Sequence, residues 1–450
     1  MSTDIRIKKG LDIKLIGEAD KTTTQLSLGS VFAIKPESFH KITPKLLAKE
    51  KSHVEAGQAL FYSKADERIL FPSPVSGEVV EINRGAKRKI LEIIIKADKD
   101  QQFQDFGKKD VANLSDDEVK AHLLASGCWP FIKQRPYDVI AKPDDKPKAI
   151  FISGYASAPL APDFEYVLKG KEAELQAAVM ALTKLTSGKV HVSIDVNASL
   201  SPFSNLNEIE LHKVSGPHPA GNISTQIAKI DPINKGEVVW TVSPQDLVII
   251  GELLLTGKFN AERTIALTGA QFNTPSYITA LPGAQIKDLV TNNLDDDNTR
   301  IISGNVLSGT KVDTEDYLGY YDTQITAIPE GNDYQLFGWL LPIFNKIATS
   351  RALIFSWMSA NKKYNLNTNT NGEHRAFVVT GAYEEVFPLD IYPMHLLKAC
   401  MYKDLDEMEA LGAYEVAPED FALTEFVCTS KQPHQQIIRE GLDLMIEEIG

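Results

Sequence analysis

The sequence predicts an α/β protein of several domains, and three observations lead to this prediction. Its 450 residues exceed the usual size of a single domain. Strand-like and helix-like segments alternate between residues 149 and 255, which is typical of an α/β layer. Short strands separated by glycine and proline precede this layer, and apolar residues at helical spacing follow it.

Residues 1–100 are predicted to contain a small β module. The motif V-x-x-G-Q-x-L begins at Val54, and the run SPVSGEVVEI begins at Ser73. Together they are similar to the biotinyl and lipoyl carrier fold, which is built from short strands. The modified lysine of a carrier would fall at Lys64, but the usual residues around such a lysine are missing. The favoured interpretation is therefore a carrier-shaped structural module.

The α/β layer is predicted to be a Rossmann-like domain over residues 149–258. Its helix at Glu172–Leu185 has apolar residues on one face, and Ser243, Pro244 and Asp246 form the start of a second helix. The other predicted regions are a helical and proline-rich connector at 101–148, a β-grasp domain of the soluble-ligand-binding type at 259–330, a strand and loop region at 331–388 with a strand and turn at 377–388, and a helical region at 389–450.

Composition and missing motifs exclude several classes of function. The net charge of −13 disfavours nucleic acid as a partner, and the densest basic run, Lys87-Arg88-Lys89, is interpreted as a solvated hairpin tip. Three widely separated cysteines predict neither a disulfide framework nor an iron–sulfur cluster. Zinc signatures and G-x-S-x-G are absent, and Asp295–Asp297 is interpreted as a solvated loop, so no catalytic or metal-ligating residue is predicted.

Any membrane role is expected to be peripheral. No apolar run approaches the ~18 residues needed to span a bilayer, and the N-terminus lacks the apolar segment of a secretory signal.

One loop has features of a nucleotide-binding site. Gly216 and Gly221 flank His218 in the run GPHPAG, and glycines before a helix can bind phosphate through backbone N–H groups. The run lacks the Lys and Ser/Thr of a P-loop, and Pro217 and Pro219 each remove an N–H donor. We therefore predict a degenerate nucleotide-type loop with a structural role, in which His218 is a hydrogen-bonded loop residue. Nucleotide or flavin binding is the alternative.

Two aromatic segments are candidate contacts for a flat apolar ligand such as a quinone. A quinone pocket is expected to be apolar with a few polar groups. Phe131, Lys133 and Arg135 lie in the first segment, where aromatic and cationic residues are interleaved, and Phe337–Phe344 is the second. The favoured interpretation of the first segment is an anchor between domains, with quinone binding as the hypothesis to test. The second segment is either core or a docking surface for a membrane subunit.

Several short segments, taken in order, resemble the A-subunit family of the Na+-translocating NADH:quinone oxidoreductase. They run from residue 5 to about residue 390 and are specific as an ordered set. The segments are Ile5–Ile13, Phe71–Gly77, Ile82–Arg88, Arg135-Pro136, Gly216–Gly221, Arg300–Gly304 and Pro388–Asp390.

The resemblance implies a subunit of a six-subunit bacterial complex that oxidises NADH, reduces quinone and exports Na+. FAD, FMN and the 2Fe–2S centre would belong to other subunits, and this chain is expected to bind no cofactor of its own. It would lie peripherally on the cytoplasmic side of the inner membrane, contact the integral membrane subunit that carries quinone and FMN, and scaffold the quinone-reduction end. Two alternatives stay open: a stand-alone flavin or NAD oxidoreductase related to the complex I NADH subunit, and a lipoyl-type carrier.

Overall fold

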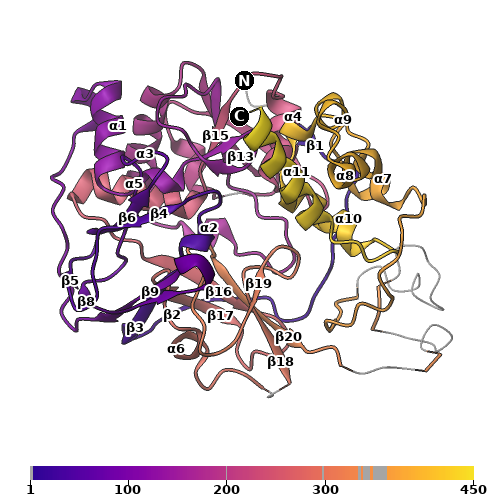
Figure 1. Cartoon of the computed structure of the whole chain (residues 1–450), viewed down its shortest axis with the longest axis horizontal. Helices are drawn as coiled ribbons and strands as arrows, with labels where there is room; N and C mark the ends of the chain where they lie inside the picture. The colour runs from indigo at the N-terminus through magenta and orange to yellow at the C-terminus, as the bar shows by residue number, and fades with distance from the viewer. Residues whose placement is uncertain are drawn as a thin grey trace.

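The computed structural model describes residues 4–198, 200–295, 298–332, 336–337, 345–347 and 362–449. The chain is a mixed α/β protein with four sheets (Figure 1). In the view of Figure 1, a seven-stranded sheet and its helices occupy the upper part, a six-stranded sheet lies below, and the C-terminal helices stand to the right.

The seven-stranded sheet has the order β1-β14-β13-β12-β15-β10-β11. The strands from β1 to β15 run parallel to their neighbours, and β10 and β11 extend the sheet with antiparallel pairs. The strands are β1 (Asp4–Arg6), β10 (Lys133–Arg135), β11 (Val139–Ile140), β12 (Ala149–Ser153), β13 (Lys189–Asp195), β14 (Glu210–Ser215) and β15 (Val239–Thr241).

Helices cover both faces of this sheet. Successive side chains of a strand point to opposite faces. In β12, Ile150 and Ile152 belong to the large core that includes α3 and α5, whereas Ala149 and Phe151 pack with Ile227 of α4. This arrangement fits the predicted α/β layer. Its helices are α1 (Asp116–Ala125), α2 (Phe164–Val167), α3 (Glu172–Leu185), α4 (Ile223–Ile230) and α5 (Pro244–Thr256).

The six-stranded sheet has the order β19-β18-β20-β16-β17-β2 and is accompanied by α6 (Ile286–Val290). Its strands are β2 (Asp20–Gln25), β16 (Arg263–Thr268), β17 (Ser276–Ala280), β18 (Thr299–Ser303), β19 (Thr310–Val312) and β20 (Gln324–Pro329). The N-terminal β module has two small sheets with the orders β3-β9-β8-β5 and β4-β6-β7. Their strands are β3 (Val31–Ile34), β4 (Pro44–Leu46), β5 (His53–Val54), β6 (Ala59–Ser63), β7 (Leu70–Pro72), β8 (Gly77–Arg84) and β9 (Ile90–Ala97).

The chain ends in short helices: α7 (Ala382–Val386), α8 (Pro393–Tyr402), α9 (Leu405–Ala410), α10 (Ala422–Phe426) and α11 (His434–Glu448). The strand predicted within residues 377–388 is wrong, because coil and then α7 occupy this segment. Val378 and Val379 have the β-branched side chains that favour a strand. Both are exposed, and in the described part of the chain no strand pairs with them.

Three segments join sheets outside their predicted regions. β1 pairs with β14 and β2 with β17, although residues 1–100 were predicted as one N-terminal region. β10 and β11 belong to the seven-stranded sheet, although residues 101–148 were predicted as a connector. These pairings join residues far apart in sequence, so local periodicity carries no signal for them.

Candidate functional site

The Gly216–Gly221 loop lies where a ligand-binding loop would be expected. It connects the carboxyl end of β14 to the N-terminus of α4. Ligands of open α/β sheets bind outside the carboxyl ends of the parallel strands. The helix expected after the loop is present as α4, and β14 precedes the loop, although no strand was predicted there. The next question is whether the backbone N–H donors of the loop are free.

Two backbone donors of the loop are used by the protein itself. The His218 N–H donates to Asp12 Oδ1 at 2.9 Å, and the Gly221 N–H donates to Ser157 Oγ at 2.7 Å. Pro217 and Pro219 carry no N–H. A carboxylate and a hydroxyl of this chain thus occupy the donors that a phosphate would need.

The glycines of the loop allow close contact between chain segments. At Gly216, where φ is +132°, a Cβ would lie 2.3 Å from the Ile7 carbonyl oxygen. At Gly221, a Cβ would lie 2.4 Å from the Tyr155 carbonyl oxygen. Backbone of this chain therefore fills the space that a pyrophosphate would use in a dinucleotide site.

His218 is a buried, neutral member of the loop. Its Nδ1 lies 3.0 Å from Ser157 Oγ. Burial lowers the pKa of His218 to about 4, so the imidazole is uncharged at neutral pH. This geometry suits a hydrogen-bonded loop residue better than a general base.

Acid is expected to destabilise the fold between about pH 6.5 and pH 4. Burial, together with His212 in the case of His191, lowers the pKa values of His191, His218 and His434 to about 4. A histidine in the unfolded chain titrates near pH 6.5, so the unfolded chain binds protons that the folded chain does not. Stability is then complete above pH 6.5 and falls as the pH drops through this window, by up to ~1.4 kcal/mol per pH unit for each histidine.

Thermal unfolding between pH 7.5 and 4.5 checks this expectation. In His218→Gln, the number of protons taken up on unfolding should fall by about one, so the unfolding free energy should depend less steeply on pH. The control is His395→Gln, because His395 is exposed. Equal pH dependence in the two variants would contradict the assignment.

An open hollow of about 580 Å³ lies beside the loop, at the edge strand β1. Two exposed cations, Arg6 and Lys8, line it together with Ile7, Ser215, Gly216 and Pro217. Ile7 is the only buried residue among these six. The hollow is positively charged, but it lacks the enclosed polar groups of a specific ligand site.

The structure brings together two of the three residues predicted to contact quinone, Phe131 and Lys133, and separates Arg135 from them. Phe131 is buried, with its ring centre 6.2 Å from that of Phe259 and 5.8 Å from that of Tyr320. Lys133 is half-buried, and its Nζ lies 4.4 Å from the centre of the Tyr321 ring. These side chains meet at an aromatic junction, which we define as Phe39, Phe131, Phe259, Tyr320 and Tyr321.

Arg135 instead points to the C-terminal helical region. Its Nη1 donates to Ser224 Oγ and its Nη2 to Glu419 Oε1, each at 3.1 Å, and its Nε lies 3.6 Å from Asp138 Oδ1. Burial alone would raise the pKa of Asp138, but Arg135 and Lys133 lower it to about 2. Arg135 therefore balances carboxylates at the contact between two parts of the chain.

Sequence reasoning missed a buried ion pair beneath the aromatic junction. Arg263 Nη2 lies 2.5 Å from Asp246 Oδ1, and both side chains are almost fully buried. Arg263 also donates to the Tyr320 carbonyl oxygen and lies over the Phe131 ring. Asp246 was predicted only as a helix-start residue, and no local signal links it to an arginine 17 positions later.

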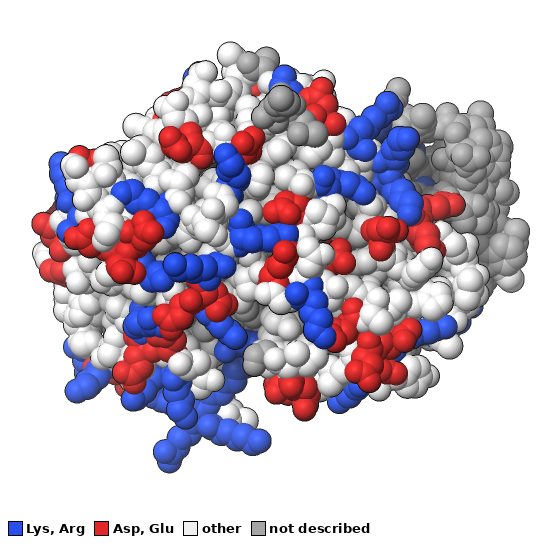
Figure 2. Space-filling view, turned by 90° about the horizontal axis from the view of Figure 1, so that it is seen from above, with Lys and Arg blue, Asp and Glu red and all other residues white. Residues whose placement is uncertain are grey.

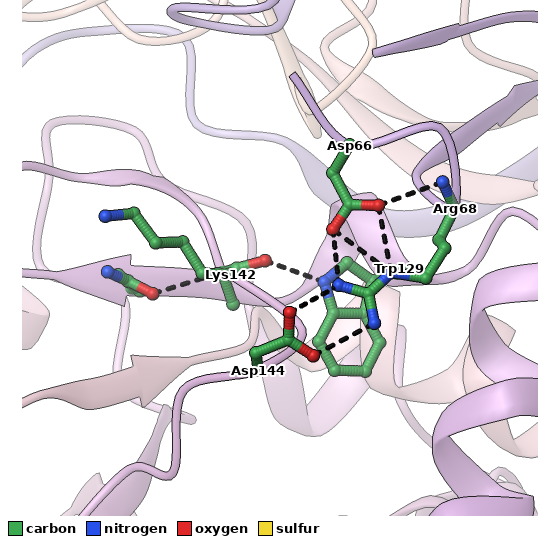
Figure 3. A network of polar contacts seen from close by, with 7 residues as sticks. Asp66, Arg68, Trp129, Lys142 and Asp144 are labelled. Atoms are coloured by element: carbon green, nitrogen blue, oxygen red, sulfur yellow. Dashed lines mark hydrogen bonds and ion pairs between the residues drawn. The ribbon is translucent and has the colours of Figure 1, made fainter. Parts of the chain in front are cut away.

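The hairpin that carries Lys64 is tied to a neighbouring segment (Figure 3). Lys64 is exposed and follows β6. Arg68, on the same hairpin, donates to Asp66 and reaches both carboxylate oxygens of Asp144 at 2.9 and 2.7 Å. Beside this network, Trp129 Nε1 donates to the Ala141 carbonyl oxygen at 2.7 Å.

The described residues contain no group of three or more His, Cys, Asp or Glu placed to hold a metal ion. The three cysteines are buried and form no disulfide: Cys128, Cys400 and Cys428. Asp296, Asp297 and most of the predicted Phe337–Phe344 segment lie outside the described residues.

Comparison with known proteins identifies the family. Three family models match successive parts of the chain: the NqrA N-terminal barrel-sandwich hybrid domain at residues 5–98, the NqrA second alpha/beta domain at 114–259 and the NqrA C-terminal domain at 264–314. One similar protein, from Neisseria meningitidis serogroup B, is named as the A subunit of Na(+)-translocating NADH-quinone reductase. It is 36% identical to this chain over 447 residues, which cover 99% of this chain and 100% of that protein. The chain belongs to the family of Na(+)-translocating NADH-quinone reductase A subunits. The resemblance found in the sequence is thereby confirmed.

Other comparisons agree with this A-subunit family or add nothing to it. A relative of the same name from Yersinia pestis bv. Antiqua is 35% identical over 447 residues, covering 99% of this chain and 100% of the relative. The solved structure of an NAD+-reducing [NiFe]-hydrogenase in the air-oxidised state matches 68% of this chain and 55% of the hydrogenase chain, with 10% sequence identity. Its TM-score of 0.35 is too low to support an inference. Among the described residues, no helix has the length and apolar character to cross a bilayer.

Proposed function

We propose that this chain is the A subunit of a Na+-translocating NADH-quinone reductase, a complex that couples NADH oxidation and quinone reduction to Na+ export. The observation that carries the proposal is the identity of 36% over 99% of the chain to a protein of that name. The chain lies peripherally on the cytoplasmic side of the membrane. There it contacts the other subunits, above all the integral membrane subunit that carries quinone and FMN.

Within the complex, the chain scaffolds the quinone-reduction end and supplies no flavin or iron–sulfur cluster. The occupied donors of the Gly216–Gly221 loop support this role, because Asp12 and Ser157 take the place of a phosphate. A quinone at the predicted segment would meet Lys133 and Tyr321, which are both half-buried. Phe131, which stacks on Tyr320, would form the inner wall of the site. Arg135 would hold β10 in place through Ser224 and Glu419.

We further propose finer assignments for the domains. The β module is lipoyl-carrier-like, the layer at 149–258 is Rossmann-like, and residues 259–330 form a β-grasp domain. Parallel strands β14, β13, β12 and β15 with helices on both faces support the second assignment.

Affinity purification of the tagged chain from membranes in mild detergent tests the function. We expect membrane subunits in the eluate, together with NADH-quinone reductase activity that Na+ stimulates. Recovery of the chain alone and without activity would overturn the proposal. A flavin absorption band in the isolated chain would then favour the oxidoreductase alternative, and added lipoyl or biotinyl mass on Lys64 the carrier alternative.

A further inference from the structure

The hairpin between β8 and β9 ends in a basic tip, defined here as Arg84, Lys87, Arg88 and Lys89. These four side chains fall within six residues, and all are exposed. The chain as a whole carries a net charge of −13. Figure 2 shows that Lys/Arg and Asp/Glu are interspersed over most of one face, whereas a group of Lys and Arg projects beyond the outline at the lower edge of the view.

The cations of the basic tip form no ion pair with the described carboxylates. Within the part of the chain that the structure describes, no carboxylate lies within 4.0 Å of any of the four. Glu92 on β9 instead accepts from Asn83 Nδ2 at 2.7 Å. A cluster of cations without ion-pair partners attracts anions over about one Debye length, roughly 8 Å at physiological salt, and Glu92 offsets one of its four charges at most.

The backbone of the tip holds two of these cations in an unusual conformation. Lys87 and Arg88 have φ angles of +55° and +60°, a region that favours glycine or asparagine. The turn is closed by the Gly85 N–H, which donates to the Lys89 carbonyl oxygen at 2.8 Å. Sparsely populated backbone conformations of this kind concentrate at functional sites. Leu91, 40% exposed, adds an apolar side chain next to the cations.

We propose that the basic tip docks on an anionic lipid surface. The proposal rests on the proposed function, because a subunit of a membrane complex lies next to lipid headgroups. A convex tip with separated point charges fits a fluid headgroup layer, whereas a protein partner would need a concave acidic site built to match it. The acidic remainder of the chain is repelled by the same surface, so binding fixes which side of the molecule faces the membrane.

Vesicle binding by the full chain tests the proposal. The vesicles are phosphatidylethanolamine with phosphatidylglycerol, and neutral phosphatidylcholine vesicles serve as the reference. Each basic residue near an anionic surface contributes about fivefold in binding, so Lys87→Gln/Arg88→Gln/Lys89→Gln is expected to weaken binding by about 100-fold. The matched control is Lys169→Gln/Lys229→Gln/Lys398→Gln, which removes the same charge from exposed lysines elsewhere and should bind nearly as the unaltered chain does.

The outcomes separate this proposal from the proposed function. Equal binding of the two triple variants, or no binding of the unaltered chain to anionic vesicles, would overturn it. A tip variant that binds vesicles normally but no longer purifies with the membrane subunits would also overturn it, in favour of an acidic protein partner. If the unaltered chain binds through the tip but never purifies with membrane subunits, the lipid site stands and the proposed function fails.

Discussion

Replacing Arg263 by methionine is expected to lower the free energy of unfolding by about 3–5 kcal/mol. The change leaves the Asp246 carboxyl group buried without its counter-charge and removes the donor to the Tyr320 carbonyl oxygen. Burial raises the pKa of Asp246, and the Arg263 guanidinium opposes this rise. Without the arginine, Asp246 is expected to take up a proton or to recruit water into the core.

The effect is large because of where the pair lies. The Arg263 guanidinium is 5.5 Å from the centre of the Phe131 ring and 5.9 Å from that of Tyr320. Phe131 precedes the strand β10 of the seven-stranded sheet, and Tyr320 precedes β20 of the six-stranded sheet. Phe39 belongs to the β module, and its ring centre lies 4.7 Å from that of Tyr320. One cation therefore supports a contact among three parts of the chain.

Thermal and denaturant unfolding, followed through the buried Trp129 and Trp240, measures the loss. The control is Arg68→Met, which breaks a network with Asp66 and Asp144 whose arginine is 46% exposed. Such a surface change is expected to cost less than about 1 kcal/mol. Adding Asp246→Asn to Arg263→Met should recover part of the stability, since no charge then stays buried. Equal losses in the Arg263 and Arg68 variants would refute the expectation.

The sequence predicted those elements whose signals are local. Helix α3 has the predicted bounds Glu172–Leu185, and α5 begins at Pro244 with Ser243 Oγ accepting from the Asp246 N–H at 3.3 Å. Capping residues and apolar spacing contain this information within a few positions. The sheet partners of β1 and β2 depend on contacts about two hundred residues away or more, and no local pattern could predict them.

The candidate site was predictable to the same limited extent. The prolines of the GPHPAG run showed that the loop lacks two N–H donors, and the helix after it was expected, but the strand β14 before it was not predicted. Asp12 and Ser157 accept hydrogen bonds from the N–H groups of His218 and Gly221. These are tertiary contacts, so the sequence could not predict them. For the same reason, Phe131 and Arg135 looked like neighbours in one ligand segment, although they face different parts of the chain.

Replacing Arg135 by methionine is the other change with a large expected effect, about 1.5–3 kcal/mol. The effect is smaller than for Arg263 because the side chains of Glu419 and Asp138 are 43% and 24% exposed. Arg135 is 2% exposed, and its two terminal nitrogens donate to Ser224 and Glu419. Its loss leaves Glu419 and Asp138 without their shared cation at the contact with the C-terminal helices. Hydrogen exchange should therefore rise first in the C-terminal helices. Arg135→Lys keeps the positive charge but loses the planar guanidinium group that donates to two partners at once. Its loss of unfolding free energy should therefore lie between that of Arg135→Met and zero.

Lys133→Gln separates this structural role from quinone binding. Lys133 lies on the same strand, two residues earlier, and its half-buried ammonium group covers the Tyr321 ring. Its replacement is expected to change the unfolding free energy by no more than about 1 kcal/mol. If the segment contacts quinone, this variant raises the KM for quinone in the assembled complex while the unfolding midpoint stays constant. The reverse result, in which Arg135→Met raises the KM without lowering stability, would make Arg135 a ligand contact and its bonds to Ser224 and Glu419 incidental.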